Sequence, residues 1–454
     1  MLEFLIKRPL ILSAIGCILA SVFGFYSKSA LLCYLVVITI WLFYFIFKLK
    51  NFNLSASGFI CIICSVSVLL TINRIDEISK FKNTTENCTF IVNEITYSGD
   101  NFYYADCEII DRKDALNHSN ISVLLSETKA KSGDILKGDL TFSEIKETYI
   151  KDSYSNKIYL SAKAQNVTET DNYDFILSGA EKLRNYIGKT LFSNVDYNES
   201  STLCALLFGD RNYFTDSFYS AVKISGTSHI MVVSGFHLSI IIMMFTFIIN
   251  KIVYNRFLKA FFIILAVLIM TTICGFTMSI LRAGITYMIM AFAITIKRPH
   301  TPENTLGAAL CIILIFSPFA IFSVALQLST LSTFGILCVS IPIQLYLKNS
   351  KIINNRFLLS ITGVISASLS ALLLTLPVTI YVFEYISKVS VITNLLISTP
   401  VTFAVVLTVI ALILNAVFPP LAKPVFFLCE GITSYINRVI ITFGSNENFI
   451  APIE

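Results

Sequence analysis

Apolar runs long enough to cross a lipid bilayer recur along this chain and constrain its fold more than any other feature. A helix needs about 20 consecutive apolar residues to span the hydrocarbon core with every backbone N–H and C=O group hydrogen-bonded internally. The composition agrees, because 55% of the 454 residues are hydrophobic and only 14% are charged, whereas about a quarter of the residues of a soluble protein are charged. The sequence therefore predicts an α-helical polytopic membrane protein.

The positions of the runs predict about eleven spans, of which the one at 320–347 is broken or tilted. The first run follows Lys7 and Arg8 and has no convincing cleavage site, so we interpret it as a retained span and not as a signal peptide. Basic residues mark cytoplasmic loops. Lys7, Arg8, Lys48 and Lys50 therefore place the stretch after the third span outside the cytoplasm, and the same alternation later places the C-terminus outside. The predicted spans cover residues 9–26, 29–47, 54–73, 228–250, 257–273, 277–296, 304–317, 320–347, 357–383, 388–415 and 424–442.

A polar insert at about 75–172 has a different periodicity. Short runs rich in β-branched and aromatic residues, such as FIVNEITY, FYYADCEII, NISVLLSE and KIYLSAKA, alternate there with turn signals at residues 98–100, 132–134 and 137–139. About five or six strands in this length indicate a small extracytoplasmic β-barrel. An OB-like barrel fits the count, and another small β-fold would fit it as well.

The cysteines divide into two groups. Most of the 11 lie in apolar runs, where a thiol behaves as a small hydrophobic group. We interpret Cys61 and Cys64, a CxxC pair inside a span, in this way and not as a redox or metal site. Cys88 and Cys107 lie in the insert. A disulfide between them is one prediction for an extracytoplasmic domain, and two unpaired buried thiols are the alternative.

Two amphipathic helices are predicted between the insert and the later spans, at about 173–192 and 215–224. Thr215 or Asp216 would cap the second helix, and Gly226 follows its end. The predicted organisation is a three-helix membrane segment, the OB-like domain, interfacial helices and a transmembrane channel domain. Their ranges are 1–74, 75–172, 173–225 and 226–454.

The segment GTSHIMVVSGFH at 226–237 is the least expected part of the apolar half. It places His229, Ser234, Gly235 and His237 at the mouth of a span, and polar groups in hydrocarbon usually mark a pathway, a substrate site or a contact between helices. The two histidines would share a broad helix face only if the helix is intact, and Gly235 could interrupt it. A hydrogen bond between helices is the alternative interpretation for each histidine.

This segment closely resembles the GTxHLLxxSGLH signature of the ComEC/Rec family of competence proteins, with Phe236 in place of a leucine. Further family motifs follow in the same order along the chain. ALLFGDR, which contains Asp210 and Arg211, resembles the ALLxGDR stretch, and SILRAG, which contains Arg282, resembles SxxRAG. RPHTPEN, SP, QLS beginning at Gln327, and FG complete the series within 200–340.

The resemblance implies a channel that imports single-stranded DNA across the bacterial cytoplasmic membrane during natural transformation. It also implies an OB-like domain after the first spans, an outer DNA receptor, a nuclease acting in trans and a cytosolic motor. The chain ends without the metallo-β-lactamase-like domain that many members carry, and it has no HxHxDH motif. No enzymatic activity, catalytic residue, metal or cofactor is therefore expected.

The functional residues that we predict for the channel are Asp210, Arg211, His229, Ser234, Gly235, His237, Arg282 and Gln327. Arg282 is the clearest, because a phosphate strand crossing lipid needs positive or hydrogen-bonding groups along a wet path. Snorkelling of Arg282 to the surface is its alternative, and a surface ion pair is the alternative for Asp210 and Arg211.

The insert is acidic, with 12 Lys and Arg residues against 18 Asp and Glu residues between Arg74 and Phe175, whereas the whole chain carries a net charge of +5. A domain that grips DNA should be basic, so we expect this one to serve folding, docking or gating. Two other functions were weighed. A small-molecule transporter should have repeated halves, and an intramembrane hydrolase based on Ser234 and His237 would lack an obvious oxyanion site.

Overall fold

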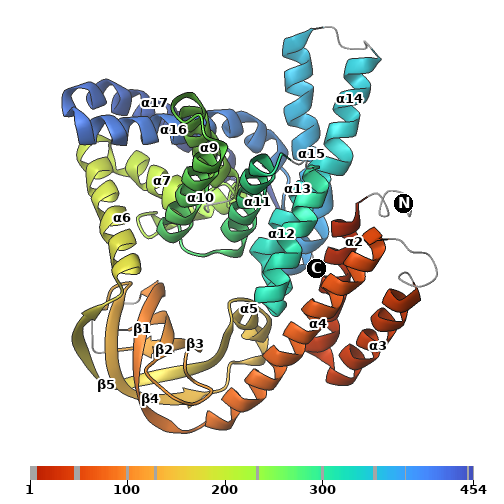
Figure 1. Cartoon of the computed structure of the whole chain (residues 1–454). Helices are drawn as coiled ribbons and strands as arrows, with labels where there is room; N and C mark the ends of the chain where they lie inside the picture. Colours follow the sequence, from red (N-terminus) through yellow and green to blue (C-terminus); the bar gives the residue numbers. More distant parts are fainter. Residues whose placement is uncertain are drawn as a thin grey trace. The chain divides into compact units, whose positions relative to one another are not determined.

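The computed structural model describes residues 8–44, 52–98, 102–126, 130–231, 235–297, 301–350, 355–383, 385–446 and 449–452. Within these ranges, nine helices are long and apolar enough to cross a membrane, and two shorter apolar helices, Lys28–Leu42 and Pro302–Phe316, coincide with two further predicted spans. The protein is therefore a mostly helical, multi-pass membrane protein with one small barrel (Figure 1).

The described chain divides into two compact units that are discontinuous in sequence. Unit 1 comprises Met1–Lys182 and His300–Leu326, and unit 2 comprises Leu183–Pro299 and Gln327–Glu454. The four predicted segments follow chain order, whereas unit 1 also includes residues 300–326 from the later part of the chain. The helices of unit 1 are α2 (Pro9–Tyr26), α3 (Lys28–Tyr44), α4 (Phe52–Ile78), α5 (Ile150–Ser155) and α12 (Pro302–Phe316).

Unit 1 contains a closed five-stranded barrel with the strand order β1-β2-β3-β5-β4. Neighbouring strands are antiparallel except β3 and β5, which are parallel. Alternate side chains of each strand fill the interior, as in β3, where Ile121, Val123 and Leu125 are fully buried. The strands are β1 (Thr85–Ser98), β2 (Tyr103–Ile110), β3 (Asn120–Leu125), β4 (Asp134–Ser143) and β5 (Ile158–Tyr173).

One predicted turn is wrong, because residues 137–139 lie inside strand β4. Gly138 is buried there and pairs with Cys88 of β1. A Cβ atom at this position would lie 3.1 Å from the carbonyl oxygen of Gln165 on β5. The glycine therefore permits a close approach of two strands at a register shift, not a reversal of the chain.

The barrel register does not bring Cys88 and Cys107 together. Cys107 pairs with Val92, four residues along β1 from Cys88, a separation of about 13 Å at the usual rise of a strand. A disulfide needs Cα atoms within about 7 Å of each other. Both cysteines are buried free thiols, and the Cys88 sulfur accepts a hydrogen bond from Arg112 Nη1 at 3.2 Å. Of the two alternatives, the structure therefore has the unpaired buried thiols.

Contacts at two places attach the barrel to the helices of unit 1. The Nη2 atom of Arg74, near the end of α4, donates hydrogen bonds to the carbonyl oxygens of Asn117 (2.8 Å) and His118 (3.1 Å). On the other side, Tyr154 of α5 packs its ring 6.0 Å from that of Phe319, in the turn after α12. The hydrogen bonds from the Arg74 guanidinium and the contact between the two rings hold the barrel at the end of α4 (Figure 1).

Unit 2 contains the remaining long helices. Helices α9, α10 and α11 pack against one another around a core that includes Leu238, Val267 and Ile280. A second core joins α16 and α17 to the short helices α7 and α8. The helices are α7 (Tyr197–Phe208), α8 (Asp216–Ile224), α9 (Gly235–Ile252), α10 (Arg256–Ile273), α11 (Met278–Thr295), α14 (Ile341–Asn349), α15 (Arg356–Phe383), α16 (Ser390–Val417) and α17 (Pro419–Gly444).

Two helices join segments of the two units. Helix α6 (Phe175–Asn194) is the first predicted amphipathic helix, and α13 (Val324–Gly335) continues through a π-helical turn at Ile336–Ser340 into α14. The predicted interruption within 320–347 corresponds to this turn, which precedes Pro342. Thr215 caps α8 by accepting a hydrogen bond from the N–H of Phe218 at 3.3 Å. Helix α7 was not predicted from the sequence.

The barrel contains a carboxylate whose titration should be measurable. Asp106 on β2 lies directly opposite Glu94 on β1. Burial, and then the negative charges of Glu94 and Asp152, raise the pKa of Asp106 to about 7. The folded barrel thus holds a proton that the unfolded chain releases near pH 4. The stabilisation from Asp106 is complete below about pH 4 and is lost as the pH rises through about 7.

We therefore expect Asp106→Asn to increase the protection of β2 amides from hydrogen exchange at pH 8, by about 1–3 kcal/mol in opening free energy, with a smaller effect at pH 5 and almost none below about pH 4. The measurement is amide exchange by mass spectrometry on the whole chain in nanodiscs. Asp139→Asn is the control, because hydrogen bonds from Asn166 and Asn87 lower the pKa of this exposed carboxyl group. Equal protection of wild type and Asp106→Asn at pH 8 would contradict the assignment.

Candidate functional site

Three of the motifs from the sequence meet where α9 begins. The N–H of Gly235, the first residue of α9, donates a hydrogen bond to the Ser279 hydroxyl oxygen on α11 at 3.3 Å. A Cβ atom on Gly235 would lie 2.9 Å from the Cβ of Ala283 and 3.4 Å from Nη2 of Arg282. The missing side chain therefore lets the start of α9 lie directly against the first turns of α11.

Arg282 is the charged centre of this arrangement. It is 8% exposed, and its Nε atom donates a hydrogen bond to the Ser329 hydroxyl oxygen on α13 at 2.8 Å. In the described part of the chain no ion pair involves Arg282. A charge enclosed among apolar helices with one neutral partner is costly, because a serine hydroxyl replaces only part of the lost hydration. We name Gly235, Ser279, Arg282 and Ser329 the arginine cluster.

Gly284 explains why the arginine is held inward. A Cβ atom on this residue would lie 3.0 Å from Val267 Cγ1 on α10. The Arg-Ala-Gly sequence therefore places two small residues on the faces of α11 that touch α9 and α10, and Arg282 occupies the space toward α13. Close packing on both sides leaves the guanidinium few alternative rotamers.

The two histidines do not share a helix. Helix α9 starts at Gly235, and His229 lies in the turn that precedes it, so the span begins later than predicted. The side chain of His229 is exposed, whereas that of His237 is 1% exposed and its ring lies 5.7 Å from the Phe236 ring. Ser234, the proposed hydrolase nucleophile, lies outside the described residues.

The turn before His229 is fixed by packing against α16. Gly226 has a φ angle of +73°, and a Cβ atom there would lie 2.5 Å from the Cβ of Ser390. The Ser387 hydroxyl donates to the carbonyl oxygen of Ile224 at 2.7 Å, which satisfies one of the last carbonyl groups of α8. Glycine is required at 226 for both its backbone conformation and its close contact.

Asp210 and Arg211 follow α7 and point to different partners. Asp210 accepts a hydrogen bond from the N–H of Asn212 at 3.1 Å and borders a cavity, and the Arg211 guanidinium lies 5.8 Å from the centre of the Tyr219 ring. No ion pair joins Asp210 to Arg211 in the described structure. Gln327 is half-buried on α13, two residues before Ser329.

The sequence alone did not single out Ser279 and Ser329 as site residues, although both lie in motifs that resemble family motifs. Serine is common at contacts between membrane helices, so neither residue carries a signal without its partner in space. Among the described residues, no group of three or more His, Cys, Asp or Glu side chains is arranged to hold a metal ion.

Comparison with known proteins is consistent with these motifs. The model of the competence protein family matches residues 206–451. ComE operon protein 3 of Bacillus subtilis (strain 168) is 25% identical over 300 residues, which cover 65% of this chain and 36% of that protein. The chain thus spans about a third of the length of this relative. No solved structure matches the chain.

The arginine cluster predicts that Gly235→Ala destabilises unit 2, because the added methyl group forces α9 away from Ala283 and Arg282. We expect a loss of about 1–3 kcal/mol in the free energy of unfolding, measured by thermal unfolding in detergent. Gly431→Ala in α17 is the control, since its Cβ meets open space and should stabilise the helix by up to about 1 kcal/mol. Equal effects of the two substitutions would show that Gly235 has no packing role.

Proposed function

Because this chain belongs to the competence protein family, we propose that it forms a membrane channel that imports single-stranded DNA across the cytoplasmic membrane during natural transformation. The family match begins near the end of α7 and covers the arginine cluster and every described helix from α8 to α17. All four residues of the arginine cluster therefore lie within the region that matches the family.

The observation that carries this proposal is the buried charge of Arg282. An arginine at the centre of a membrane span costs about 2.5–3.5 kcal/mol even on the lowest scales, and Arg282, in the second turn of α11, is still buried among helices. The Ser329 hydroxyl offsets part of that cost, and a passing phosphate group would offset more, because charge-assisted hydrogen bonds to a phosphate are among the strongest that arginine makes. The remaining N–H groups of the guanidinium are suited to this contact.

The barrel supports a role at the outer face of the same machinery. Its five strands in the order β1-β2-β3-β5-β4 fit an OB-like domain, and the basic residues flanking the first spans favour an extracytoplasmic position. Its net negative charge disfavours a grip on DNA, so the domain serves docking or gating. We further propose that the two shorter apolar helices bring the number of spans to about eleven.

The family whose model matches is that of a competence protein, which favours partners from DNA uptake. By analogy with the family, these are an outer DNA receptor, a nuclease acting in trans and a cytosolic motor.

Arg282 supplies the test. Arg282→Gln should lower the transformation frequency of the host by about 100-fold, because the phosphate contact of a desolvated cation is lost, while adsorption of DNA to the cell stays normal. The transformation frequency of Arg282→Lys should lie between those of wild type and Arg282→Gln, since the ammonium keeps the charge but not the planar set of donors. Transformation frequency and membrane abundance of each variant are the measurements.

Arg438→Gln is the matched control for this experiment, because Arg438 lies on α17 of the same unit with an exposed side chain. Its transformation frequency should equal that of wild type. Normal transformation by Arg282→Gln at normal abundance would refute a role of this arginine in the path of the strand.

A further inference from the structure

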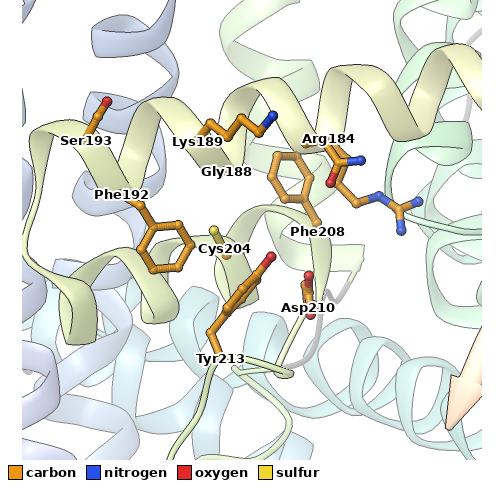
Figure 2. Close-up of a pocket in the computed structure, with 10 residues that line it drawn as sticks. Arg184, Gly188, Lys189, Phe192, Ser193, Cys204, Phe208, Asp210 and Tyr213 are labelled. Carbon is orange, nitrogen blue, oxygen red and sulfur yellow. The ribbon is translucent and has the colours of Figure 1, made fainter. Parts of the chain in front are cut away.

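A cavity in unit 2 has no role in the interactions described so far. It has a volume of about 390 Å³ and lies between α6 and the segment from α7 to Tyr213 (Figure 2). This volume falls at the lower end of the range of small-molecule sites, about 300–1,000 Å³. Its lining residues are Arg184, Asn185, Gly188, Lys189, Phe192, Ser193, Cys204, Phe208, Asp210 and Tyr213.

The charges around the cavity favour an anion. Arg184 and Lys189 supply two cations and Asp210 one anion. Burial raises the pKa of the Cys204 thiol to about 12, so this thiol is neutral. The Nε atom of Arg184 is buried and has no hydrogen-bond partner among the described residues. Such a donor is costly unless a ligand or water satisfies it.

The other walls of the cavity are aromatic. Phe192 of α6 and Tyr213 approach each other with ring centres 4.9 Å apart at 59°, and Phe208 lies on the side of Arg184 (Figure 2). The lining contains no Leu, Ile or Val. Flat ring faces beside cations form the usual arrangement for a single-stranded nucleic acid, in which bases stack and phosphates meet basic groups.

The same lining disfavours two other occupants. An acyl chain of a lipid would be expected to lie among aliphatic side chains, which are missing here. A free phosphate would gain nothing from the rings and would be repelled by Asp210, whereas the amino group of a nucleobase can donate to that carboxylate. The ligand that uses every wall is therefore an anion that carries a flat ring with N–H donors.

We propose that this cavity binds one nucleotide unit of a single DNA strand, with the phosphate at Arg184 and Lys189 and the base against Phe192 and Tyr213. The proposal rests on the proposed import function and extends it by a second binding position outside the arginine cluster. Asp210, which stands in a stretch that resembles a family motif, accepts a hydrogen bond from the base.

Gly188 offers a direct test, because it lines the cavity and a Cβ atom on it would meet open space. Gly188→Leu should fill the cavity without disturbing α6. Gly179→Leu is the matched control on the same helix: its Cβ also meets open space, and the residue does not line the cavity. The probe is a fluorescein-labelled 12-nucleotide single strand, and the receptor is the whole chain in nanodiscs of neutral lipid.

In fluorescence anisotropy, we expect Gly188→Leu to weaken binding by about tenfold and Gly179→Leu to leave it unchanged, because only the first blocks a stacking position. Arg184→Gln should weaken binding and lower the slope of log K against log salt concentration by about 0.7, the value for one phosphate contact of a single strand. Tyr213→Ala should weaken binding without changing this slope.

Three outcomes would overturn the proposal. Wild type could fail to bind the strand, or Gly188→Leu could bind it as well as Gly179→Leu. Alternatively, anionic lipid added to the nanodiscs could compete with the strand in wild type but not in Gly188→Leu, which would assign the cavity to a lipid headgroup.

The import function is tested separately in cells. If Arg282→Gln abolishes transformation while Gly188→Leu binds DNA and transforms normally, the cavity proposal fails and the import proposal stands. If deletion of the whole chain leaves transformation unchanged, the import proposal fails whatever the cavity binds.

Discussion

The cost of placing a polar group in hydrocarbon governs most of this structure. Lipid offers no hydrogen bonds, so every backbone group of a span must be satisfied within a helix and every polar side chain needs a partner or water. The arginine cluster meets this requirement only in part. Gly235 brings α9 against α11, Ser329 of α13 accepts one hydrogen bond from Arg282, and the remaining donors of the guanidinium favour a transient anionic partner.

The cavity beside α6 repeats this arrangement with different components. Arg184 has a buried donor without a partner among the described residues, and it lies beside aromatic rings and a carboxylate instead of among apolar helices. The two places would contact a strand differently. The arginine cluster offers charge alone, whereas the cavity offers charge together with a surface on which a base can stack.

The barrel follows a different physical principle, since water can satisfy its outer groups. Its interior is formed by alternating apolar side chains, and its outer face carries opposed carboxylates such as Glu94 and Asp106. Such a surface repels a polyanion. Under the proposed import function, a domain of this charge is better suited to docking or gating than to binding the strand, and Arg74 ties the loop before β3 to α4.

The sequence by itself determined the membrane class, the approximate positions of the spans, the small β-barrel and the resemblance to the competence protein family. These properties depend on runs, alternation and motifs, which are local along the chain. Local patterns could not decide three other features. These are the disulfide between Cys88 and Cys107, the turn at 137–139 and the start of the span at 228. Strand register, close approach of β5 and packing against α16 are contacts between distant segments.

Only the tertiary structure joined Ser329 to Arg282 and enclosed a cavity between α6 and the end of α7. The partners are 47 residues apart in the first case, and the walls of the cavity come from three successive segments in the second. A serine or a phenylalanine in an apolar sequence is ordinary, and it becomes part of a site only when packing places it beside an unsatisfied charge.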